Sequence, residues 1–158
     1  MDKNIIPGKG LKELRFGMTK DEVEAQFGKP DETETYKLEG QEEYTVEAWH
    51  FDTIEMSLTF EEEFDFRLTS IAASSDEFTI EEGLAIGKDK ERILDMINEI
   101  DWYPVEFEKD GQPSDEENFD TITLPEKSVH FWFDNDILSE IQWSVHWTED
   151  EEPIWANK

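Results

Sequence analysis

Hydrophobic and polar residues alternate along several stretches of the chain, which is the pattern of half-buried antiparallel strands. The clearest stretches are 54–60, 129–133 and 141–147, where every second residue is aliphatic or aromatic. Segments 44–51, 66–73 and 119–124 complete three strands in each half of the chain. Turn-forming residues at 110–113 and 134–136 separate neighbouring strands. The pattern therefore predicts two three-stranded antiparallel meanders.

Two short amphipathic helices are predicted ahead of these strands. Thr19 and Glu22 have the spacing of a capping box, in which each side chain bonds the other residue's backbone amide. Asp89 has the corresponding N-cap position in the second helix. Gly28 and Pro30 end the first helix. Because helices of about three turns are not stable alone, both must pack against the sheet.

The two helix starts lie 70 positions apart, as do matching residues further along the chain. Residues 14–23 match 84–93, and residues 67–71 match 137–141. A repeat of this length predicts two tandem modules, 1–76 and 77–158, packed as one compact unit. The expected fold class is α+β. Each module is a helix plus a three-stranded antiparallel meander, and the two form a continuous curved sheet with helices on one face.

Charge narrows the partners that the chain can bind. It has 158 residues, with 42 Asp and Glu against 14 Lys and Arg, and a net charge of −28. Such a surface repels the phosphates of nucleic acid and of anionic membranes. Aromatic residues make up 13% of the chain, which provides the apolar area that disordered acidic segments lack. No segment approaches the ~18 apolar residues of a membrane span. The expected location is cytoplasmic, or periplasmic or secreted if a leader has been removed.

Residues 14–30, LRFGMTKDEVEAQFGKP, resemble the signature of the SmpA/OmlA (BamE-like) superfamily. Two tandem copies resemble the beta-lactamase inhibitor protein superfamily. The second copy keeps Gly87 and Ile93 but loses the Phe-Gly-x-Pro ending. Both resemblances imply a binding module of helices and sheet without catalytic residues. The chain has no Cys for a lipid anchor, so membrane anchoring is not carried over from the family.

The sequence contains no recognised motif for catalysis or cofactor binding. It has no Gly-x-Ser-x-Gly, no phosphate-binding Gly-x-x-x-x-Gly-Lys, no His-Glu-x-x-His and no Cys. His130 and His146 are expected on one face of the sheet, either as a metal pair or as hydrogen-bonded or solvent-facing side chains. The acid-rich loops 110–120 and 134–136 offer oxygen ligands for calcium but lack the spacing of an EF-hand. We predict that the protein is not an enzyme and has no cofactor.

Aromatic residues indicate a binding surface. The chain has six Trp, and alternation sends some of them to the face of the sheet away from the helices. Trp49 joins that face if Val46 and Ala48 point inward. The predicted partner-binding residues of the face are Trp49, His130, Trp132, Gln142 and His146. Acidic loop ends add Glu62, Glu63, Asp115 and Glu116. The alternative for any single Trp is burial between the modules.

These observations predict a non-enzymatic protein-binding module. In this hypothesis an acidic inhibitor or immunity-type protein binds a basic partner protein, such as a toxin or a secreted enzyme, through an aromatic sheet face. The net charge far exceeds the magnitude of about 2–8 that solubility requires, although halophilic adaptation would also produce it. Two alternatives stay open: an envelope or outer-membrane assembly adaptor of the BamE type, and a calcium- or small-ligand-binding module.

Overall fold

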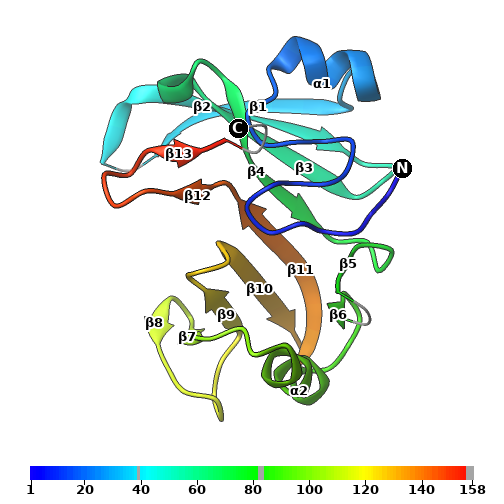
Figure 1. Cartoon of the computed structure of the whole chain (residues 1–158), viewed down its shortest axis with the longest axis vertical. Helices are drawn as coiled ribbons and strands as arrows, with labels where there is room; N and C mark the ends of the chain where they lie inside the picture. Colours follow the sequence, from blue (N-terminus) through cyan, green and yellow to red (C-terminus); the bar gives the residue numbers. More distant parts are fainter. Residues whose placement is uncertain (39, 82–83, 156–158) are drawn as a thin grey trace.

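The computed structural model describes residues 1–38, 40–81 and 84–155. Its main feature is an antiparallel sheet of nine strands in the order β1-β2-β3-β4-β11-β10-β9-β7-β8 (Figure 1). These strands are β1 (Glu32–Leu38), β2 (Gln41–Phe51), β3 (Met56–Glu61), β4 (Arg67–Ala73), β7 (Glu106–Lys109), β8 (Gln112–Pro113), β9 (Thr121–Leu124), β10 (Val129–Asp134) and β11 (Ile137–Ser144). Two small hairpins pair β5 (Thr79–Ile80) with β6 (Leu84–Ala85), and β12 (His146–Trp147) with β13 (Pro153–Ile154).

Helix α1 (Lys20–Phe27), helix α2 (Lys90–Ile100) and a single 3-10 turn, η1 (Glu62–Phe64), complete the described elements. The predicted capping box of α1 is confirmed: Glu22 N donates to Thr19 Oγ1 at 3.2 Å, and Thr19 N donates to Glu22 Oε1 at 3.1 Å. Asp89 is the N-cap of α2, as predicted, and accepts a bond from Arg92 N at 2.8 Å. One first-turn amide of each helix is therefore satisfied by its N-cap side chain, while Lys90 N of α2 donates to Asp136 O at 2.9 Å.

The loops before the two helices are attached to neighbouring central strands by equivalent backbone bonds. Gly17 N donates to Leu68 O on β4 at 2.9 Å, and Gly87 N donates to Leu138 O on β11 at 2.8 Å. Leu68 N returns a bond to Met18 O and Leu138 N to Lys88 O, both at 2.8 Å. Each residue in the first set of bonds lies 70 positions before its counterpart in the second set: Gly17 before Gly87, Leu68 before Leu138 and Met18 before Lys88. These bonds place both helices against the middle of the sheet, whereas duplication of the whole module stays a prediction.

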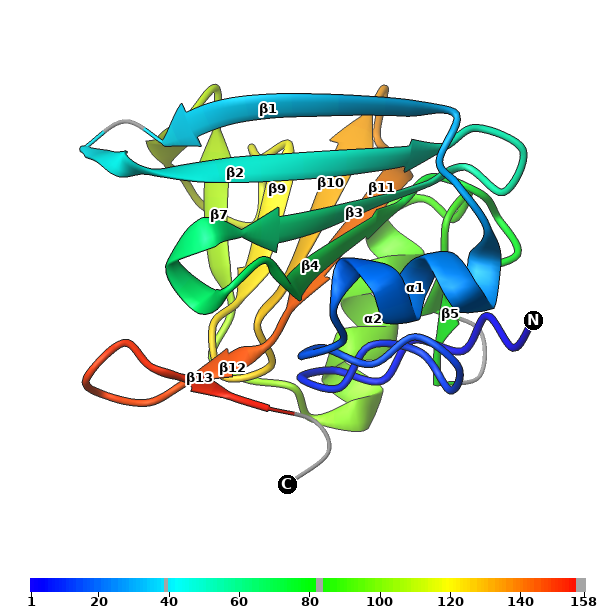
Figure 2. The same cartoon turned by 90° about the horizontal axis from the view of Figure 1, so that it is seen from above.

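One hydrophobic core fills the space between the helices and the sheet. Both helices and the N-terminal segment lie on the same side of the curled sheet (Figure 2). Val23 of α1 and Ile93 and Ile97 of α2 are buried in the same cluster as the inward-facing residues of the central strands. Trp143 of β11 is fully buried, and its Nε1 donates to Gly10 O at 3.1 Å. This bond satisfies the indole N–H inside the core.

The predicted fold class is wrong. The chain is mostly β, with one large antiparallel sheet and, within the described ranges, two short α-helices, rather than two helix-plus-meander modules. The two halves merge because β4 pairs with β11, with Ala72 opposite Gln142 and Ser70 opposite Ser144. The sequence analysis also missed β1 and β7, which add further strands to each side of this junction. Pairing between segments so far apart in sequence leaves no local pattern.

Candidate functional site

The face of the nine-stranded sheet that lies away from the helices is called here the open face. The pairing of the strands identifies which side chains point to this face, because residues directly opposite in antiparallel strands point to the same side. One row of such residues crosses eight strands, and most of its members are half-buried. The row consists of Glu32, His50, Ser57, Ala72, Gln142, His130, Thr123 and Glu106.

Polar side chains on the open face bond to one another. His130 Nδ1 lies 2.9 Å from Thr123 Oγ1, and Gln142 Nε2 donates to Ser70 Oγ at 3.3 Å. Burial of the His130 imidazole lowers its pKa, against the opposing effect of Glu108 and Glu106. These groups already have partners on neighbouring strands, so the middle of the open face is polar but internally satisfied.

A Ser–His–Glu arrangement lies at one end of this row. His50 Nδ1 is 2.7 Å from Ser57 Oγ, and His50 Nε2 is 2.6 Å from Glu34 Oε1. Serine nucleophiles use such a set, together with backbone N–H groups that stabilise the oxyanion. Ser57 lies in β3, which pairs with β2 on one side and β4 on the other. Its neighbouring N–H groups therefore belong to the ladder. We interpret the set as a cross-strand contact, and absence of catalysis stays a prediction.

Of the predicted aromatic contacts, Trp132 lies on the open face and Trp49 does not. Trp132 is 44% exposed and lies between Thr121 and Glu140 on the adjacent strands. Trp49 is 7% exposed, packs against Phe60 with ring centroids 4.9 Å apart, and donates from Nε1 to Glu47 at 2.5 Å. Its expected exposure is therefore wrong.

The error at Trp49 has a structural cause. Val46 and Ala48 are buried on the open face, while Trp49 pairs with Leu58 on the inner face. Strand β2 is thus buried on both sides along this stretch. Alternation alone then cannot tell which side faces the helices.

The remaining predicted residues are dispersed. His146 lies in β12, beyond the end of β11, with Nδ1 3.0 Å from Ser128 Oγ and its ring against Gly8. It therefore does not pair with His130. Within the described residues no three His, Asp or Glu side chains are grouped as metal ligands. Asp115 and Glu116 are exposed in the turn after β8, at the edge of the sheet away from η1, which contains Glu62 and Glu63.

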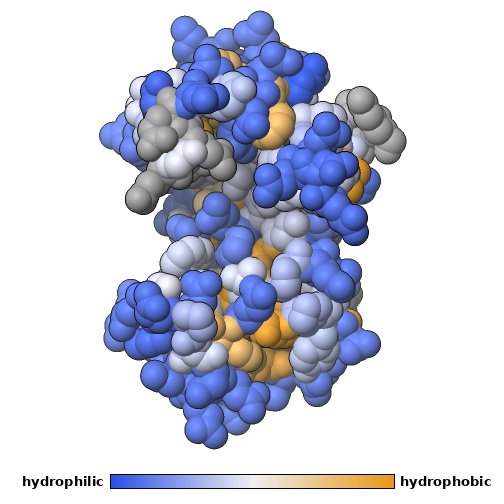
Figure 3. All heavy atoms as spheres, turned by 90° about the vertical axis from the view of Figure 1, so that its left-hand side faces the viewer, coloured by the Kyte–Doolittle hydropathy of each residue, from blue (hydrophilic) through white to orange (hydrophobic). Residues whose placement is uncertain are grey.

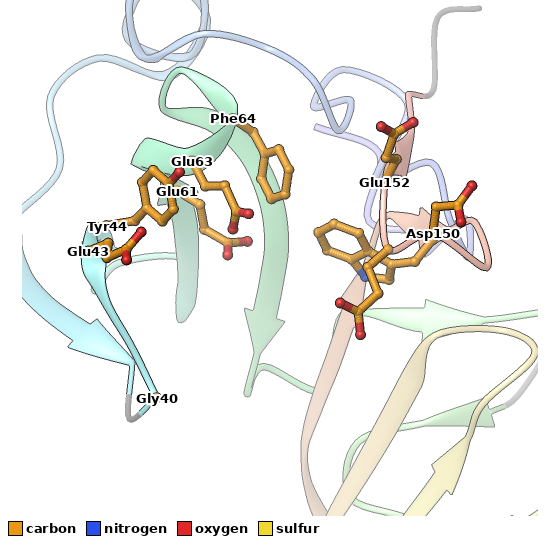
Figure 4. Close-up of a pocket in the computed structure, with 10 residues that line it drawn as sticks. Gly40, Glu43, Tyr44, Glu61, Glu63, Phe64, Asp150 and Glu152 are labelled. Carbon is orange, nitrogen blue, oxygen red and sulfur yellow. The ribbon is translucent and has the colours of Figure 1, made fainter.

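A groove of about 1210 Å³ lies between the η1 region and the β12–β13 hairpin (Figure 4); it is called here the acidic groove. One wall comes from the start of β2, the end of β3 and η1, and the other from β12 and the turn that follows it. Six carboxylates line it: Glu43, Glu61, Glu63, Asp150, Glu151 and Glu152. Of the described lining residues, none is lysine or arginine. The groove thus joins two acidic segments that are far apart in sequence.

Three aromatic rings lie among these carboxylates: Tyr44, Phe64 and Trp147. Tyr44 is 41% exposed and Trp147 is 39% exposed, while Phe64 packs against Trp147 with ring centroids 5.4 Å apart. Phe64 also contacts Trp155, at 6.3 Å between centroids. This contact tethers the segment after the C-terminal hairpin to η1. The sequence analysis named Glu62 and Glu63 as partner-binding residues but none of these three rings, because only the folded hairpin brings the rings together.

Electrostatics in the acidic groove favour a cation. Burial raises the pKa of Glu61, while a 2.5 Å hydrogen bond from Thr69 Oγ1 lowers it and the charge of Glu63 raises it further. Arg67 stands opposite Glu61 in the ladder, but its guanidinium donates to Gly17 O at 2.8 Å instead. The ion pairs found among the described residues, Lys3–Glu77, Lys20–Glu47, His50–Glu34 and Lys90–Asp136, all lie outside the groove. Its negative charge is therefore not neutralised by these pairs.

The surface on this side of the molecule is mostly hydrophilic. Seen from the left of Figure 1, it narrows between two halves, and its main hydrophobic area lies in the lower half, which contains α2 and β7–β10 (Figure 3). Within the described ranges, no helix has both the length and the apolar character required to cross a bilayer.

Comparison with known proteins gives one informative similarity. No family model and no curated protein matches the chain. The crystal structure of an extracellular protein containing a SCP domain from Bacillus anthracis str. Ames is similar in fold, with a TM-score of 0.54 and 15% sequence identity. The match covers 82% of this chain and 44% of that protein. At this identity the similarity concerns the fold alone.

Proposed function

We propose that the protein is a non-enzymatic binding module for a basic partner protein, acting as an inhibitor or immunity-type protein. The observation that supports this proposal is the lining of the acidic groove, where six carboxylates and three rings meet without lysine or arginine among the described lining residues. Carboxylates in such numbers repel one another, so a cationic surface that enters the groove relieves repulsion as well as forming new pairs.

The rings and the charges have different roles in this proposal. A net charge of −28 creates a long-range field that accelerates encounter with a basic surface. Exposed aromatic residues provide short-range contact area once the partner has docked, and they are the residue types that dominate binding energy at interfaces. We expect charge to govern the association rate and the rings to govern the dissociation rate.

Affinity capture followed by measurements on purified partners tests the proposal. Each captured protein is purified, and its Kd and association rate are measured at about 0.05 M and about 0.3 M salt, where screening differs strongly. We expect a basic partner whose association rate falls by about tenfold or more over this range. If the partner has an activity, we also expect inhibition at equimolar ratio. A tight partner with an acidic surface, or binding that salt does not affect, would contradict the proposal.

A further inference from the structure

We propose that the acidic groove binds an extended, arginine-bearing segment of the partner. This inference rests on the proposed function, because it names the part of a basic partner that enters the groove. The groove is partly open to solvent rather than enclosed, and its walls come from separate parts of the chain. We infer that arginine side chains stack on Trp147 and Tyr44 while their guanidinium groups pair with carboxylates on both walls.

The arrangement of the walls supports an extended segment. In Figure 4, Glu43, Glu61 and Glu63 project from one wall, Asp150 and Glu152 lie on the other, and Phe64 stands between them. An extended backbone sends successive side chains to opposite sides. Consecutive residues of such a segment would therefore reach both walls in turn. A helix would present its charges on one face every three or four residues, which suits a single wall.

The combination of rings and carboxylates favours arginine over lysine. A guanidinium is planar, so it stacks on an aromatic ring while its N–H groups form paired bonds with a carboxylate. A lysine ammonium is a compact, strongly hydrated charge that cannot do both with the same geometry. Exposed Trp147 and Tyr44 lie in the same groove as Glu63 and Glu152, so both kinds of contact are within one site.

The test uses the full chain and a labelled peptide of about seven residues in which pairs of consecutive arginines are separated by single serines, so that arginines point to both sides of the extended backbone, which is roughly 23 Å long. Two companion peptides replace each arginine by lysine or by glutamine. Binding is measured by fluorescence anisotropy at about 0.05 M salt. We expect the arginine peptide to bind about threefold to tenfold more tightly than the lysine peptide. The glutamine peptide should show no binding.

Matched variants locate the site. Glu63→Gln with Glu152→Gln removes one charge from each wall, and Asp95→Asn with Glu99→Gln removes the same charge from the exposed side of α2. We expect the first pair to weaken the arginine peptide by about tenfold. The second pair should change its affinity by less than about twofold, because charges farther away than the Debye length, about 14 Å at about 0.05 M salt, are largely screened.

A variant at Trp147 tests the aromatic contact of the site. Trp147→Ala should weaken the peptide by about tenfold or more, and Trp147→Phe should restore most of the affinity. Thermal melting by circular dichroism identifies a Trp147 variant that fails to fold. In that case the Glu63→Gln, Glu152→Gln variant alone tests whether the peptide binds in the groove. Equal losses in the groove pair and the α2 pair would overturn the inference, because only net charge would matter. Equal affinities for the arginine and lysine peptides would overturn the arginine preference.

The same variants separate this inference from the proposed function. If a purified basic partner binds the Glu63→Gln, Glu152→Gln variant as tightly as the natural chain, the groove is not its site, while the proposed function stands. If no basic protein and no arginine peptide binds the natural chain, both proposals are wrong.

Discussion

The middle of the open face and the acidic groove are both polar surfaces, but they differ in how many of their side chains have hydrogen-bond partners. On the open face, His50, His130 and Gln142 have hydrogen-bond partners on adjacent strands. In the acidic groove, the carboxylates of Glu61 and Glu63 lie close together near Tyr44, and Asp150 and Glu152 lie on the opposite wall. A partner would have to replace existing bonds on the open face, whereas in the groove it would supply the missing charge.

This comparison favours the acidic groove over the middle of the open face as the binding surface. The sequence analysis placed the aromatic contact on the open face, where the structure leaves Trp132 exposed and buries Trp49. The groove instead gathers Tyr44, Phe64 and Trp147. We therefore regard the middle of the sheet as a scaffold and the end that bears the C-terminal hairpin as the candidate contact surface.

The largest expected effect distinguishes the buried tryptophan from the exposed one. Trp49→Ala should lower the free energy of unfolding by about 3–5 kcal/mol, because it removes a packed ring from the core. Trp132→Ala should change it by less than about 0.5 kcal/mol. Urea denaturation followed by circular dichroism measures both. Similar losses in the two variants would contradict the assignment of faces.

A smaller effect tests whether the open face is internally satisfied. Ser57→Ala leaves His50 Nδ1 without its 2.7 Å partner, and we expect a loss of about 1 kcal/mol in the free energy of unfolding. Glu63→Gln in the groove should change this free energy by less than about 0.5 kcal/mol, because its side chain is exposed. The same denaturation experiment compares them. A neutral Ser57→Ala would show that the cross-strand bond contributes nothing.

The smallest effect is a pH dependence of stability at the edge of the groove. The raised pKa of Glu61 means that folding favours its protonated form, with burial as the main cause. The resulting stability is present below the unfolded pKa of 4.5 and is lost as pH rises through the raised folded pKa. Glu61→Gln should therefore be more stable than the natural chain near neutral pH, with the difference shrinking toward pH 4.5. Thermal melting across this range measures the difference. A constant difference would contradict the assignment.

Local structure was predictable where neighbouring residues decide it. Thr19 and Glu22 form a capping box from their spacing alone, and Asp89 caps α2 in the same way. The strand around Leu58 and the hairpin turn at residues 134–136 also follow the alternation and the turn-forming residues. Strand β1 could not be recognised, because its sequence ETETYKL is polar along most of its length and it lies exposed at the sheet edge.

The sequence by itself determined the acidity of the chain, the starts of both helices and most central strands, because each depends on composition or on contacts within a few residues. Tertiary structure alone decided that β4 and β11 join the two halves into one sheet. It also decided that Trp49 turns inward and that Phe64 meets Trp147. These features depend on packing between residues far apart in the chain, which periodicity does not record.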